Sequence, residues 1–251
     1  MASFINTYAK EISKQLDFLI TWPISTNVKL GDVGILEDEV FKRTDTLDNL
    51  GIAKPRVRNG LGEDIVNEYT SKNGIEITVD PNMEGKLNGV GGKIDIKFNR
   101  EGAVFLRLYN HVLKQFESTD QLGKDIIQRF INGNWQKNRV IVTEIISCSN
   151  ATVLVAGSNN AKASLQLDVS LPVTEALAKG KFAQSIGFTG SFGAKIIGAN
   201  VSPLIRICGI KPKWFGYGNT DFRSKKDILN NDVPDSIEFS KIHSSNDLID
   251  F

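Results

Sequence analysis

The stretch NRVIVTEIISCSNATVLVAG, residues 138–157, has two runs of apolar, mostly β-branched residues around a polar segment. This pattern predicts a β-hairpin, with strands at residues 140–146 and 152–156 and a turn at 147–150. Val140, Ile141 and Val142 follow one another directly, so we expect both faces of the first strand to be buried. Its one charge, Glu144, is expected to face a cationic partner or a sheet edge.

The bulk composition indicates a folded, globular protein. The chain has 251 residues, of which 41% are hydrophobic and 24% charged, and its formal net charge is +1. This balance gives no reason to expect binding to nucleic acid. There is no apolar run near the roughly 20 residues of a membrane-spanning helix, and no pattern of a secretory signal. Cys148 and Cys208 lie in apolar runs, which favours buried, reduced thiols and a cytoplasmic location.

Periodicity along the chain predicts an α+β fold, in which a twisted, mainly antiparallel sheet is accompanied by an N-terminal helix and a few further helices. Helical spacing of apolar residues predicts helices over residues 3–20 and roughly 119–132. Alternation predicts a strand over residues 75–79 and a last strand over 204–210.

Two amphipathic hairpins stand out in this pattern. Residues 94–98 and 104–108 alternate around a turn at 99–102, and residues 165–171 and 186–196 alternate around a longer connection. We therefore expect a single body over residues 1–215. Residues 216–251 are polar with scattered hydrophobic side chains, and are predicted to be a linker with a short C-terminal segment that docks on the body.

Catalytic and metal-binding motifs are missing from the sequence. His111 and His243 are the only histidines, and neither HExxH, GxSxG, CxxC nor a phosphate-binding loop is present. We therefore expect no metal, no cofactor and no enzymatic activity. A Cys148–His111 pair is the one nucleophilic arrangement worth testing. Loss of an activity on mutating Glu144, Asp95 or His111 would point to an enzyme.

The order of these elements, taken with two short motifs, resembles the pore-forming domain of gasdermins. The stretch VIVTEII within residues 138–157 is similar to an apolar strand of that family, and NVSPLIRICGI, residues 200–210, is similar to its closing strand. The resemblance covers residues 3–212. It implies a protein that is monomeric when latent, is activated by a protease that removes a short C-terminal segment, and then forms a homo-oligomeric pore at the inner face of the membrane.

The same resemblance implies roles for particular side chains. Residues implied to contact membrane lipid are Ile94, Ile96, Phe98, Val104, Leu106, Leu108, Leu165, Leu167, Val169, Ile186, Phe188 and Phe192. Residues implied to make the autoinhibitory contact are Ile237, Phe239, Leu248, Ile249 and Phe251. The implied biological setting is cell death in defence.

Two features depart from the family pattern. Bacterial members carry a lipid-modified cysteine near the N-terminus, whereas the first cysteine here is Cys148. Animal members have a large inhibitory domain, for which residues 216–251 leave no room. The alternative is a soluble, non-enzymatic α+β module that binds a partner or a lipid with an apolar sheet face or cavity, because soluble antiparallel sheets alternate in the same way.

Overall fold

The computed structural model describes residues 2–23, 27–60, 68–79, 93–167, 182–212 and 237–248, and shows an α+β fold, as predicted. The described elements are α1 (Ala2–Leu16), β1 (Leu19–Thr21), β2 (Asp32–Glu37), β3 (Val40–Thr46), β4 (Val57–Asn59), β5 (Glu68–Thr70), β6 (Ile75–Val79), β7 (Lys93–Phe98), β8 (Val104–Phe116), α2 (Asp120–Ile131), β9 (Arg139–Ala156), β10 (Lys162–Leu167), β11 (Phe182–Thr189), β12 (Phe192–Pro212), β13 (Ile237–Ile242) and the 3-10 helix η4 (Ser245–Leu248).

The larger of two sheets is organised around β9. This strand pairs antiparallel with β8 and β12 along most of its length and with β2 at its start. β12 also pairs with β1, β1 runs parallel to β3, and β3 pairs with β2, so these strands close a circuit back to β9. The inside of the circuit is filled by apolar side chains, among them Leu19, Phe41, Val142 and Ile207.

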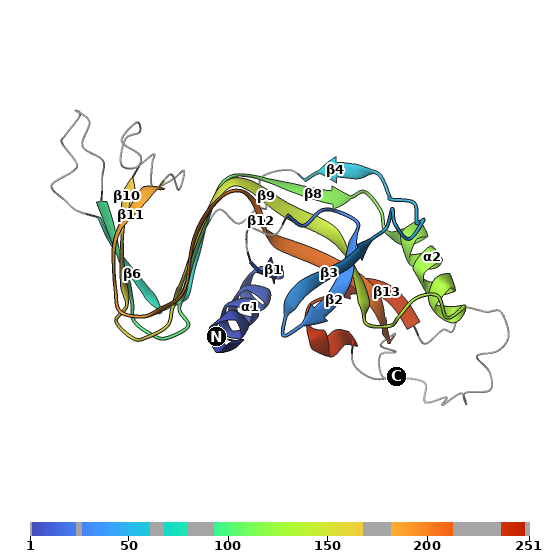
Figure 1. The fold of residues 1–251 in the computed structure, drawn as a ribbon, viewed down its shortest axis with the longest axis horizontal. Coiled ribbons are helices and arrows are strands. Elements are labelled where there is room, and N and C mark those ends of the chain that lie inside the picture. Colours follow the sequence, from blue (N-terminus) through green and yellow to red (C-terminus); the bar gives the residue numbers. More distant parts are fainter. Residues whose placement is uncertain are drawn as a thin grey trace.

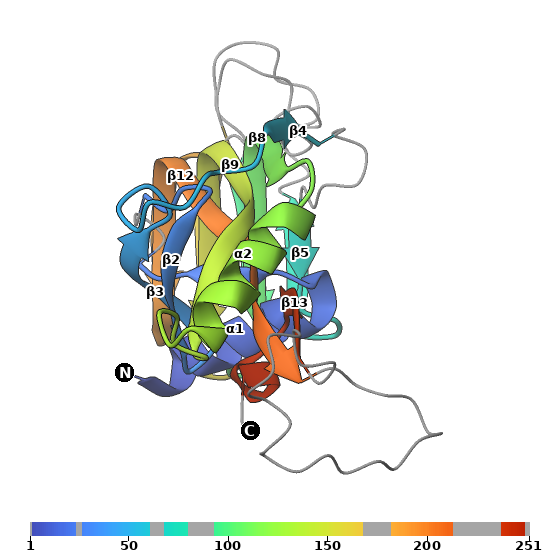
Figure 2. The same ribbon diagram turned by 90° about the vertical axis from the view of Figure 1, so that its right-hand side faces the viewer.

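The smaller sheet has the strand order β11-β10-β7-β6 and is antiparallel throughout. Figure 1 shows it at the far end of the molecule from α2, while β8, β9 and β12 arch over α1. Figure 2 is viewed from the end of the molecule where α2 lies, and shows α2 lying across the large sheet. There α2 contributes Leu122 and Ile126 to a cluster with Ile210 and Ile237.

The predicted hairpin at residues 140–156 is wrong. Arg139 to Ala156 form one strand of 18 residues, β9. The polar segment stays in the strand because its side chains find partners on both neighbouring strands. Ser149 Oγ accepts a hydrogen bond from Asn110 Nδ2 at 2.8 Å, and Ser147 Oγ lies 3.1 Å from Ser202 Oγ. Burial on both faces of residues 140–142 was predicted and is confirmed.

The hairpin predicted from residues 94–98 and 104–108 is also wrong. β7 pairs with β6 and β10 in the small sheet, whereas β8 pairs with β9, β4 and β5 in the large one. The alternation identified both strands, but a tight connection leads equally well to the adjacent strand or to a different sheet.

The second hairpin is confirmed for β10 and β11, which pair from Lys162 with Thr189 to Leu167 with Phe182. The strand predicted over residues 186–196 is split, since β11 ends at Thr189 and β12 begins at Phe192. β12 then runs on to Pro212 and includes Pro203, where the register with β9 shifts between Val201 and Leu204. A bulge is one of the few places where a strand accommodates proline.

The helix predicted over residues 119–132 is confirmed as α2, whereas the predicted N-terminal helix is shorter than expected. It ends at Leu16, because Asp17 adopts a left-handed conformation with a φ of 57° and turns the chain into β1. Leu19 and Ile20, expected on the helix, belong to this strand.

Candidate functional site: a sheet folded back on itself

The small sheet continues the three longest strands of the large sheet, β8, β9 and β12. β7 leads into β8 through residues 99–103, β9 leads into β10 through 157–161, and β11 leads into β12 through 190–191. The neighbours correspond too: β10 lies between β7 and β11, just as β9 lies between β8 and β12. The two sheets are therefore one set of three strands that has been bent back.

The register of two of these strands is the same on both sides of the bend. Ile94 pairs with Leu165 in the small sheet, and Val104 pairs with Val155 in the large one. The eleven residues from Ile94 to Val104 thus match the eleven residues from Val155 to Leu165. Straightening the two connections would extend this ladder without sliding one strand past the other.

The third strand does not match in this way. Lys162 pairs with Thr189 and Ala156 pairs with Phe192, so the five residues 157–161 lie between these pairs on one strand and only the two residues 190–191 on the other. A straightened β11–β12 would need a bulge opposite it at residues 157–161.

Each connection contains one residue with a positive φ. The angle is 72° at Gly102, 60° at Asn160 and 86° at Gly190. Regular strands have a negative φ, so these three residues hold a conformation that belongs to the bend. A Cβ at Gly190 would also come within 3.0 Å of Ala161 Cα, which explains why the tightest connection has glycine there.

Hydrogen bonds tie the connections to one another. The Glu101 amide donates to Asn159 Oδ1 at 2.9 Å, and the Gly157 amide donates to the Ser191 carbonyl at 2.9 Å. The Ser191 amide donates to Ser158 Oγ at 3.2 Å. These hydrogen bonds hold the three connections together in the bent conformation.

The apolar face of the small sheet is buried against the large one. Ile94, Ile96, Phe98 and Leu165, all predicted as membrane-contacting residues, have no exposed surface and pack with Phe105, Leu154 and Ala156. Phe188 and Phe192 are partly buried at the rim of this cluster, and their ring centroids lie 5.2 Å apart.

Of the other residues predicted to contact the membrane, some lie in a second apolar cluster and the rest lie outside the described residues. Val104, Leu106 and Leu108 are buried on the opposite face of the large sheet, where they pack against Tyr8 and Ile12 of α1. The side chains of Leu167 and Ile186 and the whole of Val169 lie outside the described residues. The structure thus places the described residues of this set in two clusters on either side of one sheet.

The C-terminal segment, residues 237–248, lies against the body. β13 pairs with β12 from Ile237 opposite Pro212 to Ile242 opposite Ile207. Ile237 and Ile242 are buried, and Phe239 and Leu248 are partly buried. Ile249 and Phe251 lie outside the described residues. Contact between this segment and the body is shown, while an inhibitory role for it stays a prediction.

Charged groups join this segment to the end of α1. Asp17 Oδ1 lies 2.6 Å from His243 Nδ1, and Asp17 Oδ2 accepts a hydrogen bond from Lys241 Nζ. Ser245 Oγ donates to Glu39 Oε1 at 2.8 Å on the β2–β3 turn. Sequence reasoning missed Asp17 and Glu39, because their partners lie more than two hundred residues away.

The residues considered for catalysis have ordinary structural partners. His111 and Cys148 occupy paired positions on β8 and β9. Burial raises the pKa of the Cys148 thiol to about 12 and lowers the pKa of His111, which disfavours a thiolate–imidazolium pair. Glu144 Oε2 accepts a hydrogen bond from Arg206 Nη1 at 2.7 Å, so the predicted cationic partner is confirmed. Asp95 accepts a hydrogen bond from Ser164 Oγ.

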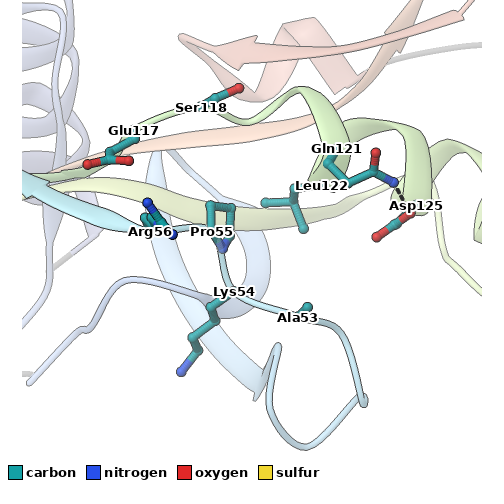
Figure 3. Close-up of a pocket in the computed structure, with 9 residues that line it drawn as sticks. All are labelled: Ala53, Lys54, Pro55, Arg56, Glu117, Ser118, Gln121, Leu122 and Asp125. Atoms are coloured by element: carbon teal, nitrogen blue, oxygen red, sulfur yellow. Dashed lines mark hydrogen bonds between the residues drawn. The ribbon is translucent and has the colours of Figure 1, made fainter.

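A pocket of about 270 Å³ lies elsewhere, between the start of α2 and residues 53–56 (Figure 3). Its rim carries charges of both signs, on Lys54, Arg56, Glu117 and Asp125. Lys54 is paired with Asp48, and Asp125 accepts a hydrogen bond from Gln121 at 2.9 Å. None of the predicted membrane-contacting and autoinhibitory residues that the structure describes lines this pocket. Separately, none of the helices in the described part of the chain is long and apolar enough to cross a membrane.

Comparisons with known proteins give little further information. No protein-family model matches the chain, and no curated protein matches its sequence. Among solved structures the chain is similar to a bacterial gasdermin from Bradyrhizobium tropiciagri, with a TM-score of 0.35 and 14% sequence identity, over 82% of this chain and 87% of that chain. At this TM-score and identity the likeness carries no conclusion about the function of this chain.

Proposed function

We propose that this chain is a latent pore-forming protein. In the proposed conversion the three connections straighten and the small sheet swings away from the large one. β7 with β8, β9 with β10, and β11 with β12 then become continuous strands that cross a bilayer. The shared register on both sides of the bend is the observation that carries this proposal.

The period of two in a strand supports the proposal. If the register continued through the connections, even-numbered residues from 94 to 108 would share one face with their partners on β9 and β10. That face would unite side chains from two separate clusters: Ile94, Ile96, Phe98, Val104, Leu106, Leu108, Leu165, Ala163, Val155, Val153 and Ala151. Within the connections, Arg100 and Asn159 are polar residues at the corresponding positions.

Along β7 and β10 the opposite face suits water, whereas further along β8 and β9 that face carries the apolar residues Phe105 and Leu154. Asp95, Lys97, Lys162 and Ser164 lie at the alternate positions of β7 and β10, and Asp95 and Lys162 are exposed in the folded protein. Strands that cross a membrane combine an apolar side toward lipid with a polar side toward water, and need about 9–11 residues to span it. Each straightened strand would exceed that length.

The C-terminal segment supplies a reason for latency. β13 covers the edge of β12 beyond β1, and an uncovered edge is a template for pairing with another chain. We therefore propose that a protease releases residues 237–248 and that the freed subunits oligomerise at membrane lipid, at the inner face of the membrane. The proposed action is non-enzymatic and needs no cofactor.

Dye release from anionic liposomes tests the proposal. A site for a sequence-specific protease is placed within residues 217–231, and the same protease is added to this variant and to the unmodified chain. Size-exclusion chromatography shows whether the cut segment leaves, and a chain that ends before Ile237 gives a second route to the same state. We expect release only where the segment has been removed.

The opposite outcome would favour the soluble binding module. A folded chain without residues 237–251 that releases no dye and stays monodisperse would overturn the pore-forming proposal. Under the alternative, native mass spectrometry of the intact protein would show a bound small molecule or lipid.

A further inference from the structure

The first helix touches the connection between β7 and β8. A Cβ added to Gly102 would lie 2.5 Å from Thr7 Cγ2, so the connection and the helix are in close contact there. One turn further along the helix, Glu11 Oε1 accepts a hydrogen bond from Arg100 Nη2 at 3.0 Å. Both partners, Arg100 and Gly102, belong to residues 99–103.

Glu11 is the only acidic residue of α1, and it gathers three donors on one oxygen. Besides Arg100, Tyr69 Oη and Ser71 Oγ each donate to Glu11 Oε1 at 2.8 Å. The Glu11 side chain is 21% exposed, so water competes only partly for these bonds. The carboxylate therefore joins α1 to β5, to the turn after β5 and to the β7–β8 connection.

Ser71, which is hydrogen-bonded to Glu11, is also hydrogen-bonded to Val104, the first residue of β8. The Val104 amide donates to Ser71 Oγ at 2.9 Å, and the Ser71 amide donates to the Val104 carbonyl at 3.0 Å. Glu11 thus holds groups at both ends of the connection, directly through Arg100 and through Ser71 at Val104. Straightening the connection would move Arg100 relative to Val104 and so break the cluster.

The C-terminal segment holds the other end of the same helix. Ser13 Oγ donates a hydrogen bond to the His243 carbonyl at 2.9 Å. The carboxylate of Asp17, the residue directly after α1, is hydrogen-bonded to the side chains of His243 and Lys241. One helix therefore bridges the segment proposed to leave and the bend proposed to open.

Docking of α1 also has an unfavourable component. The Tyr8 side chain has no exposed surface, and its hydroxyl has no hydrogen-bond partner in the described part of the chain. Undocking would return this hydroxyl to water, which favours release. The same helix thus carries one group that favours docking, Glu11, and one that opposes it, Tyr8.

We infer that α1 is a latch that keeps the β7–β8 connection bent, that Glu11 is its point of attachment, and that the C-terminal segment holds the latch in place. The effect of the latch on pore formation rests on the function proposed above. The latch itself is a property of the folded chain and is measured without a membrane.

Two tyrosines provide a matched test. Tyr69→Phe and Tyr8→Phe each delete one hydroxyl from the same kind of side chain, one bonded to Glu11 and one without a partner. Glu11→Gln removes the charge, and Lys10→Gln at an exposed position of α1 is the control. Amide hydrogen exchange is followed in the full-length chain at Gly102 and Val104, with Ile52, bonded to the Leu47 carbonyl, as a distant reporter.

The latch predicts opposite effects from the two tyrosine variants. Glu11→Gln should accelerate exchange at Gly102 and Val104 by about tenfold, and Tyr69→Phe by a smaller factor. Tyr8→Phe should slow exchange at these amides severalfold. Lys10→Gln should leave them unchanged, and Ile52 should respond in no variant. Equal rates in Glu11→Gln, Tyr69→Phe and the unmodified chain would overturn the inference.

Dye release after removal of the C-terminal segment separates this inference from the proposed function. Faster release by Glu11→Gln and Tyr69→Phe, with slower release by Tyr8→Phe, would support both. The predicted exchange rates with no release from any variant would support the latch and overturn the pore. Release at one common rate, with unchanged exchange, would support the pore and overturn the latch.

Discussion

Asn160 has a φ of 60° in the connection from β9 to β10, and its Cβ makes this conformation less favourable than at Gly102 or Gly190. Asparagine is among the few residues that tolerate the left-handed region. Local backbone preference thus favours the bend at Gly102 and Gly190 and tolerates it at Asn160.

Asn160→Ala should lower the free energy of unfolding by about 1 kcal/mol, because alanine is less tolerant of a positive φ. Asn160→Gly should be at least as stable as the unmodified chain. Urea denaturation measures both. Asn49→Ala is the matched control, because Asn49 is exposed and lies outside the left-handed region. The explanation fails if Asn160→Ala unfolds at the same urea concentration as this control.

At the scale of elements, α1 is held by two carboxylates. Burial alone would raise the pKa of Glu11, but hydrogen bonds from Tyr69 and Ser71 and the charge of Arg100 outweigh burial, so the pKa of Glu11 is lowered. Burial likewise opposes ionisation of Asp17, and bonds from Lys241 and His243 outweigh it, so the pKa of Asp17 is lowered. Both carboxylates therefore favour docking when ionised.

The sign of the pH dependence follows from these lowered pKa values. A carboxyl group whose pKa is lower in the folded state adds stability above its unfolded pKa, about 4, and loses it as the pH falls through the folded value. At pH 7, Glu11→Gln should be less stable than the unmodified chain by about 1–2 kcal/mol, within the range for charge-assisted hydrogen bonds at a partly exposed site.

Urea denaturation of both proteins at pH 7 and near pH 3 checks this. The stability difference should shrink at the lower pH, because below the unfolded pKa of about 4 Glu11 takes up a proton more readily in the unfolded chain, and its ionised form then favours folding less. An unchanged difference would show that Glu11 acts through its shape and not through its charge.

The strands themselves were largely predictable, whereas their partners were not. Alternation located β6, β7, the start of β8 and the end of β10, because burial on one face imposes a period of two. Residues 99–103 looked like a hairpin turn because Gly102 suits a tight turn in either setting. Choosing between a hairpin and a bend needs contacts such as Thr7 with Gly102 and Glu11 with Arg100, which lie far apart in sequence.

At the scale of the whole molecule, β13 completes the large sheet from the distant C-terminus. Ile242 is 2% exposed and packs in the cluster that fills the closed circuit of strands, while Phe239 lies against Gly123 of α2. The segment therefore contributes to the core of the body as well as to its edge.

Ile242→Ala should lower the free energy of unfolding by about 2–3 kcal/mol, in the lower part of the range for large-to-small changes in a core, because an edge strand relaxes more easily. Val57→Ala on β4, where Val57 is 51% exposed, should change it by less than about 0.5 kcal/mol. Urea denaturation gives both values, and size-exclusion chromatography reports any association through an uncovered β12 edge. Equal effects of the two changes would mean that β13 is not part of the core.

The sequence alone determined which side chains share a face of a strand, since that depends only on the period of two. This is why Ile94, Ile96, Phe98, Val104, Leu106 and Leu108 were recognised as the apolar faces of two strands, and all six are buried in the structure. Only the tertiary structure decided that the first three face one cluster and the last three another, because a bend at residues 99–103 reverses the face that the chain presents. The alternation of apolar and polar residues shows that one face of a strand is apolar. What covers that face depends on the path of the whole chain.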